Sequence, residues 1–182
     1  MPLFTSSREK RLWLYTFLVW TAIFSTLVFG GYLVLTMDQD LQGALFFYTM
    51  IALAATVILH GLITRPGKAE ITIWLGLSAV CIMLYARLGF AERSHLFEYS
   101  VLAIFIHKAL NERKLQGKKI TNPGLLAFLI AFGIGVLDES IQLFLPGRVF
   151  DPLDMLVNGL AAFMAIGTSS VIRWVRKVTN KF

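Results

Sequence analysis

The sequence is poor in charged residues and lacks the motifs of the common enzyme classes. Charged side chains make up only 15% of the 182 residues and apolar side chains 57%, against about 25% and roughly 45–50% in an average soluble protein. The single cysteine, Cys81, excludes an intramolecular disulfide. No P-loop, dinucleotide fingerprint, HExxH helix or nucleophile elbow is present. A chain this short cannot bury so much apolar surface within itself, so we expect the excess to face lipid.

The apolar residues form six long runs separated by polar segments. A helix that crosses about 30 Å of hydrocarbon needs about 20 mostly apolar residues. The first run follows a basic segment, as in a signal peptide, but it is too long for one and no cleavage pattern follows, so we expect it to be retained. The sequence predicts an all-α polytopic membrane helix bundle, with an N-terminal half (1–91), a C-terminal half (92–182) and helices at 12–35, 44–63, 71–90, 94–110, 124–145 and 152–175.

The run at 94–110 leaves two topologies open. Its 17 residues rise only about 25 Å and include Glu98, so the alternative is five spans with this segment at the membrane surface. The basic residues favour six spans. Of the 17 Lys and Arg residues, all except Arg87, Arg93 and Arg148 fall on one side of a six-span chain. Because an excess of basic residues marks the cytoplasmic side, we expect both termini to be cytoplasmic.

Most acidic residues fall on the opposite, outer side, and several lie inside the predicted helices. Ionisable groups within a span are costly, roughly 2.5–3.5 kcal/mol each at mid-membrane, and therefore mark candidate functional sites. In the six-span topology the outer ends of the last three helices meet, which predicts an acidic, outward-facing pocket at headgroup depth. Its candidate binding residues are Glu92, His95, Glu98, Tyr99, Asp138, Glu139, Gln142, Arg148, Asp151, Asp154 and Asn158.

Structural explanations compete for some of these residues. Asp151 precedes Pro152, in a position typical of a helix N-cap, and an ion pair between Arg148 and an acidic residue would pin the turn before the last helix. Glu92 and His95 have the spacing found in di-metal helical bundles, but those sites need two such copies and further carboxylates. We therefore expect no metal and no cofactor.

Two segments of the C-terminal half resemble the signatures of the VanZ-like family. Residues 138–159 read DESIQLFLPGRVFDPLDMLVNG, and residues 92–99 read ERSHLFEY. The resemblance implies a multi-pass protein of the bacterial inner membrane. The family is named after a small membrane protein linked to resistance to the glycopeptide antibiotic teicoplanin.

We expect the pocket to bind an envelope lipid headgroup, or an amphiphile such as a lipoglycopeptide at the outer leaflet, without catalysis. Arg148 would contact an anionic group, and the acidic residues would accept hydrogen bonds from hydroxyl or amine groups. Two alternatives stay open. One is a membrane enzyme acting on lipid-linked envelope precursors, with Glu98, Glu139 and His95 as catalytic candidates; the other is a small proton-coupled transporter. Membrane lipids are expected partners, and the basic residues are explained by orientation and anionic lipid rather than by nucleic acid.

The six-span topology predicts which positions a membrane-impermeant thiol reagent reaches. In a chain whose Cys81 has been replaced, we expect Ser94→Cys to be labelled in intact cells, because it lies at the outer end of the fourth span. Gln116→Cys is expected to react only after the membrane has been opened. Labelling at position 116 in intact cells would contradict this topology.

Overall fold

The computed structural model describes residues 3–38, 90–145 and 150–179, together with single positions between 40 and 83. The predicted spans 44–63 and 71–90 fall almost entirely outside the described residues. The described part is helical throughout and contains no strand. Its helices are α1 (Ser7–Thr36), α4 (Phe90–Leu115), α5 (Pro123–Gln142) and α6 (Pro152–Thr179).

Three of the four helices are long and apolar enough to cross a membrane. Their candidate spans are Ser7–Phe29, Pro123–Gln142 and Pro152–Val178. This confirms the prediction of an all-helical chain with membrane-spanning segments. α4 does not belong to this group. Its 26 residues rise about 39 Å, so the helix is longer than the helix predicted at 94–110. By length it reaches across the hydrocarbon, but by composition it is too polar to do so while exposed to lipid.

Local sequence signals set the turn between α4 and α5. Gly117 follows α4 with a φ of 87°, a left-handed conformation that glycine adopts without steric cost. Asn122 caps α5, because its Oδ1 accepts a hydrogen bond of 3.1 Å from the backbone N–H of Leu125. Pro123 occupies the first turn, where a missing N–H is tolerated. The turn reverses the chain, so α5 runs back alongside α4.

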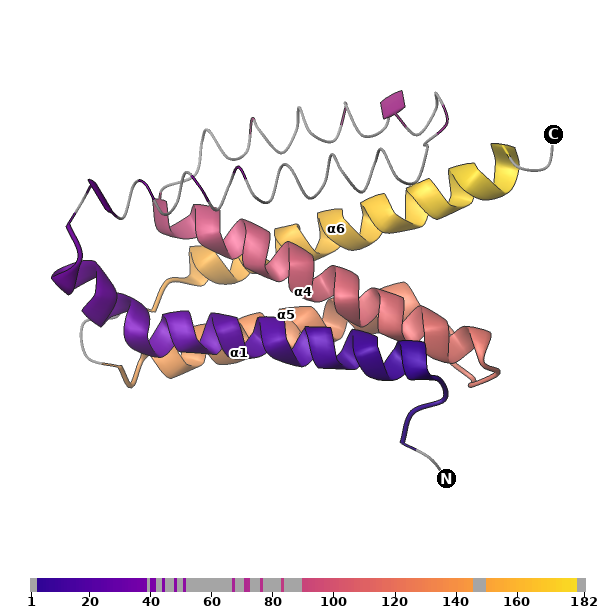
Figure 1. The fold of residues 1–182 in the computed structure, drawn as a ribbon, viewed down its shortest axis with the longest axis horizontal. Helices are drawn as coiled ribbons and strands as arrows, with labels where there is room; N and C mark the ends of the chain where they lie inside the picture. The colour runs from indigo at the N-terminus through magenta and orange to yellow at the C-terminus, as the bar shows by residue number, and fades with distance from the viewer. Residues whose placement is uncertain are drawn as a thin grey trace.

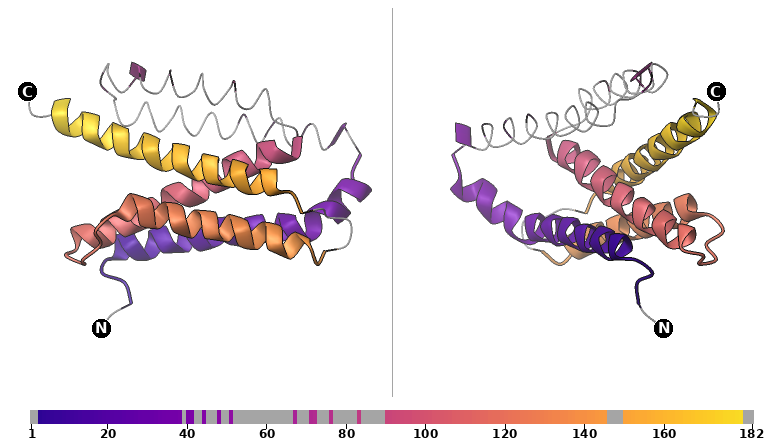
Figure 2. Two further views of the ribbon diagram at one scale, coloured as in Figure 1. Left: turned by 180° about the vertical axis from the view of Figure 1, so that it is seen from behind. Right: turned by 45° about the vertical axis from the view of Figure 1, so that its right-hand side comes forward.

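α4 is the central helix of the described bundle. It packs against α1, α5 and α6, whereas α1 and α5 touch each other only slightly. The ribbon shows α4 crossing α1 and α6 obliquely (Figure 1; Figure 2), and α5 packs against both α4 and α6. The start of α1 and the end of α6 lie at the same end of the bundle (Figure 1).

The core follows from this arrangement. α4 contributes the largest share, and α5 and α6 face it with small side chains that allow close approach. The core residues are Ile23, Leu96, Tyr99, Leu102, Ala103, Ile106, Leu110, Ala127, Ala131, Val157, Ala161, Ala162 and Ile166. The surrounding helices carry large apolar side chains on their outer faces, among them Phe17, Phe29, Leu129, Leu137, Leu156 and Phe163. These faces are suited to lipid.

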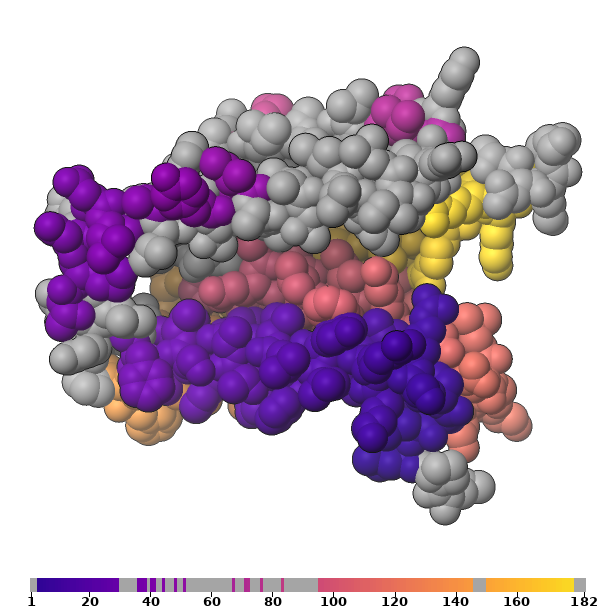
Figure 3. Space-filling view, in the orientation of Figure 1, coloured from indigo at the N-terminus to yellow at the C-terminus, as the bar shows by residue number. Residues whose placement is uncertain are grey.

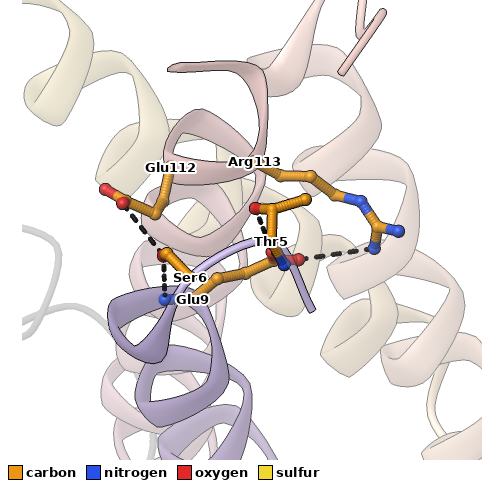
Figure 4. A network of polar contacts seen from close by, with 5 residues as sticks. All are labelled: Thr5, Ser6, Glu9, Glu112 and Arg113. Carbon is orange, nitrogen blue, oxygen red and sulfur yellow. Dashed lines mark hydrogen bonds and ion pairs between the residues drawn. The ribbon is translucent and has the colours of Figure 1, made fainter. Parts of the chain in front are cut away.

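A polar network ties the start of α1 to the end of α4 (Figure 4). Glu9 is fully buried; its Oε2 accepts a hydrogen bond of 2.6 Å from the Thr5 backbone N–H, and its Oε1 lies 3.4 Å from Arg113 Nη1. Ser6 Oγ donates to Glu112 Oε1 at 3.0 Å and accepts from the Glu9 backbone N–H at 3.0 Å. The sequence pattern did not predict the burial of Glu9.

Two glycines on α5 allow a matched test of this packing. A Cβ atom at Gly135 would lie 3.1 Å from Asn158 Cβ and 3.3 Å from Tyr99 Cε1, whereas one at Gly133 would meet nothing within 4 Å. We expect Gly135→Leu to destabilise the protein by about 1–3 kcal/mol through overpacking, lowering its melting temperature in detergent. Gly133→Leu should leave the melting temperature unchanged or raise it. Equal effects of the two substitutions would contradict the observed α5–α6 contact.

Candidate functional site

Three helix termini meet at the end of the bundle opposite the described chain termini. α4 and α6 begin there and α5 ends there (Figure 1). The predicted binding residues on these termini are His95, Glu98 and Tyr99 of α4, Asp138, Glu139 and Gln142 of α5, and Asp154 and Asn158 of α6. The side chain of Glu92 and the whole of Arg148 lie outside the described residues.

His95, Asp138 and Glu139 form the centre of this cluster. A ring nitrogen of His95 and one carboxylate oxygen of each acidic residue all lie within 4.8 Å of one another. Asp138 is 6% exposed and Glu139 is fully buried, whereas His95 is half-buried. Imidazole nitrogen and carboxylate oxygen are ligands for divalent metals, so these three side chains, from two helices, have the types and spacing of a metal-binding set.

Neutral hydrogen-bond donors hold the two central carboxylates in place. Tyr99 Oη donates to Asp138 Oδ2 at 3.0 Å, and Gln142 Nε2 donates to Glu139 Oε1 at 2.8 Å. A longer hydrogen bond of 3.4 Å runs from the backbone N–H of Asp151 to Glu139 Oε2. This last contact links the entry to α6 with the end of α5.

Two further acidic residues belong to the same electrostatic environment. The charges of His95 and Asp138 both act on Glu98, which is half-buried on α4. Asp154 of α6 acts on Glu139 together with His95 and Asp138. The cluster is therefore rich in hydrogen-bond acceptors and negative charge, which suits a cation, an amine or hydroxyl groups.

Asn158 lies one turn deeper in the bundle. It is fully buried, and neither its Oδ1 nor its Nδ2 has a hydrogen-bond partner among the described residues. A Cβ atom at Gly135 would lie 3.3 Å from both Asn158 Nδ2 and Tyr99 Cε1, so the amide lies beside the ring whose hydroxyl holds Asp138. His95 Nδ1 is likewise buried without a hydrogen-bond partner in the described part of the chain.

Asp151 has the structural role that competed with a binding role in the sequence analysis. The residue is exposed, and its Oδ1 accepts a hydrogen bond of 2.8 Å from the backbone N–H of Leu153. This is the geometry of an N-cap at the start of α6. Only its backbone N–H reaches the cluster, through Glu139.

A second polar feature lies at the other end of the bundle, where α4 and α6 diverge. A cavity of about 740 Å³ opens there, with Lys114, Arg173 and Lys177 among its lining residues, and the space-filling view shows the opening between the two helix ends (Figure 3). Arg173 Nη2 lies 2.9 Å from Nε2 of the buried His107. This cavity was not predicted from the sequence, because its lining residues come from three helices.

The fold and the cluster define an all-helical membrane protein with a His–carboxylate site at one end of its bundle. The family model described as VanZ/LLP1 matches residues 3–173, nearly the whole chain, so the protein belongs to the VanZ/LLP1 family. This confirms the resemblance seen in the two motifs and extends it through the N-terminal half, where no motif had been identified. No curated protein and no solved structure matches the chain.

Removing one hydroxyl tests whether the cluster is held as described. Tyr99→Phe would leave the buried Asp138 without its 3.0 Å donor, which costs about 1–3 kcal/mol and should lower the melting temperature in detergent. Tyr15→Phe on α1 is the matched control: Tyr15 is 44% exposed, and its ring contact with Phe105 survives the change. A melting temperature that is equally insensitive to both substitutions would contradict the Tyr99–Asp138 hydrogen bond.

Proposed function

We propose that this protein is a six-span membrane protein whose acidic cluster faces outward and binds the headgroup of an envelope lipid or a related amphiphile. The observation that carries the proposal is the meeting of His95, Asp138 and Glu139 at one end of the bundle, within 4.8 Å of one another. His95 belongs to α4, and Asp138 and Glu139 belong to α5, so two helix ends supply one cluster.

The course of the chain supports an even number of spans. α1 and α5 run toward the end that holds the cluster, and α4 and α6 run away from it (Figure 1). The segment between α1 and α4 therefore leaves from and returns to that end, which is compatible with two crossings at 44–63 and 71–90. The basic side chains Lys114, Arg173 and Lys177 line the opposite end. An acidic outer end and a basic cytoplasmic end agree with the positive-inside rule.

The chemistry of the cluster favours a ligand with amine or hydroxyl groups. Carboxylates accept hydrogen bonds and pair with cations, and Glu98, Asp138 and Glu139 supply three of them in one environment. Phosphatidylethanolamine carries an ammonium group next to acyl chains, and a lipoglycopeptide such as teicoplanin carries hydroxyl and amine groups next to an acyl tail. Apolar side chains such as Leu156 and Phe163 are exposed on the outer face of α6, where an acyl chain would lie.

An enzyme acting on lipid-linked envelope precursors is the second candidate. The proximity of His95 to Asp138 and Glu139 favours it, because a carboxylate beside an imidazole is a common acid–base pair. The two candidates differ in whether the bound molecule is altered. Mass spectrometry of the recovered ligand distinguishes them.

Substitution of Glu139 tests the binding proposal. The full-length protein would be placed in phosphatidylglycerol nanodiscs, and its affinity for teicoplanin and for added phosphatidylethanolamine would be measured. We expect Glu139→Gln to weaken binding of at least one probe roughly tenfold or more, because a charged hydrogen-bond acceptor becomes neutral. Glu9→Gln is the matched control, since Glu9 is also a fully buried glutamate but lies at the other end of the bundle.

The outcomes separate the alternatives. Binding that Glu139→Gln weakens and Glu9→Gln leaves unchanged supports the proposal. Equal binding by all three proteins, or no binding of either probe, contradicts it. A chemically altered probe recovered only from proteins that retain Glu139 would favour the enzyme instead.

A further inference from the structure

We infer that His95, Asp138 and Glu139 bind a divalent first-row transition-metal ion, with zinc as the best-suited candidate. The inference rests on the proposed function in that it concerns the same cluster and names its cofactor. The binding of the metal itself requires no amphiphile. The sequence did not predict this metal site. The spacing of Glu92 and His95 concerns a single helix, whereas Asp138 and Glu139 lie on another helix.

The spacing of the donor atoms is the first argument. Zinc binds imidazole nitrogen at about 2.0–2.1 Å and carboxylate oxygen at about 2.0–2.2 Å, so two ligands of a tetrahedral zinc ion lie about 3.4 Å apart. The three donor atoms all lie within 4.8 Å of one another. To bind one ion, these atoms would move closer together through side-chain rotations on α4 and α5.

Unsatisfied buried atoms are the second, independent argument. His95 Nδ1 is buried without a hydrogen-bond partner among the described residues, and so are both amide atoms of the fully buried Asn158. A buried polar atom left without a partner costs about 1–3 kcal/mol, and such atoms in folded proteins commonly mark an absent ion or water. Asn158 lies beside the Tyr99 ring, whose hydroxyl donates a hydrogen bond to Asp138.

The hydrogen bonds around the donor set have the form found around metal ligands. Ligating carboxylates are usually oriented by hydrogen bonds from residues that do not touch the metal. Tyr99 Oη supplies one such bond to Asp138 Oδ2 and Gln142 Nε2 another to Glu139 Oε1. Both donors are neutral, and a buried carboxylate is stabilised further by a nearby cation.

The donor set also selects the kind of ion. One imidazole with two carboxylates favours zinc, manganese or iron over magnesium and calcium, which prefer oxygen ligands alone. Three protein ligands leave at least one position of a tetrahedral zinc ion open. An oxygen atom of a headgroup can take that position, which connects the metal with the proposed binding function.

Zinc binding is tested on the purified full-length protein in detergent, stripped with a chelator and without any added amphiphile. We expect one zinc ion per chain after gel filtration, a zinc-dependent rise in melting temperature and, with cobalt in place of zinc, the visible absorption of a low-coordinate site. His95→Gln and Asp138→Asn should each weaken zinc binding at least tenfold. His107→Gln is the matched control, because His107 is also buried on α4 but lies toward its other end, and it should bind zinc as the unmodified protein does.

Several results would overturn the inference. One is a zinc content well below one ion per chain. Another is an equal zinc affinity of the unmodified protein and His95→Gln. Either result would mean that protonation of the carboxyl groups, and not a metal ion, allows them to lie close together. If His95→Gln does not fold, Asp138→Asn and the cobalt spectrum of the unmodified protein decide the question. Amphiphile binding without zinc binding refutes the metal site alone, whereas zinc binding without amphiphile binding refutes the proposed function alone.

Discussion

The polarity of α4 constrains the arrangement of every other described helix. A backbone and side chains that face hydrocarbon must be satisfied within the protein, and α4 carries His95, Glu98, Tyr99 and His107 along its length. It is therefore enclosed by α1, α5 and α6, which have the apolar surface that α4 lacks. α1, α5 and α6 are long and apolar enough to span a membrane, whereas α4 is not apolar enough. Because the surrounding helices shield α4, its polar side chains can lie inside the bundle rather than in contact with lipid.

This division explains how much of the fold the sequence predicts. The predicted bounds of α1, α5 and α6 lie close to the observed ones, because a helix in contact with lipid needs an unbroken run of apolar residues. α4 was predicted as 94–110 and extends over Phe90–Leu115. Its last turns depend on protein contacts, Glu112 with Ser6 and Arg113 with Glu9, and no hydropathy pattern reports such contacts. The same contacts explain why the burial of Glu9 was not predicted.

The sequence could propose which residues belong to the candidate site, but it could not predict which of them contact one another. The predicted six-span topology places Glu98, Asp138 and Glu139 at one depth, and this made them candidates. Which side chains meet depends on the rotation of α4 about its axis relative to α5, and spacing within one helix carries no information about it. The spacing pointed from His95 toward Glu92, whereas the structure places Asp138 and Glu139 beside His95. The role of Asp151, by contrast, could be predicted from the local sequence. It directly precedes Pro152, the first residue of α6, and its side chain caps that helix.

The packing below the cluster closes it off from the other end of the bundle. Gly135 lets Asn158 approach α5 closely, and the next layers of the bundle consist of Leu102, Ala103, Ile106, Ala131 and Ala161, all buried. Within the described residues the acidic cluster and the basic cavity at the other end are therefore separated by a close-packed apolar core. Along the shared axis of these helices the described residues form no polar path between the two ends. If the cluster binds a headgroup as proposed, the headgroup enters from the end where α4 and α6 begin, and its acyl chains lie beside the exposed apolar side chains of α6.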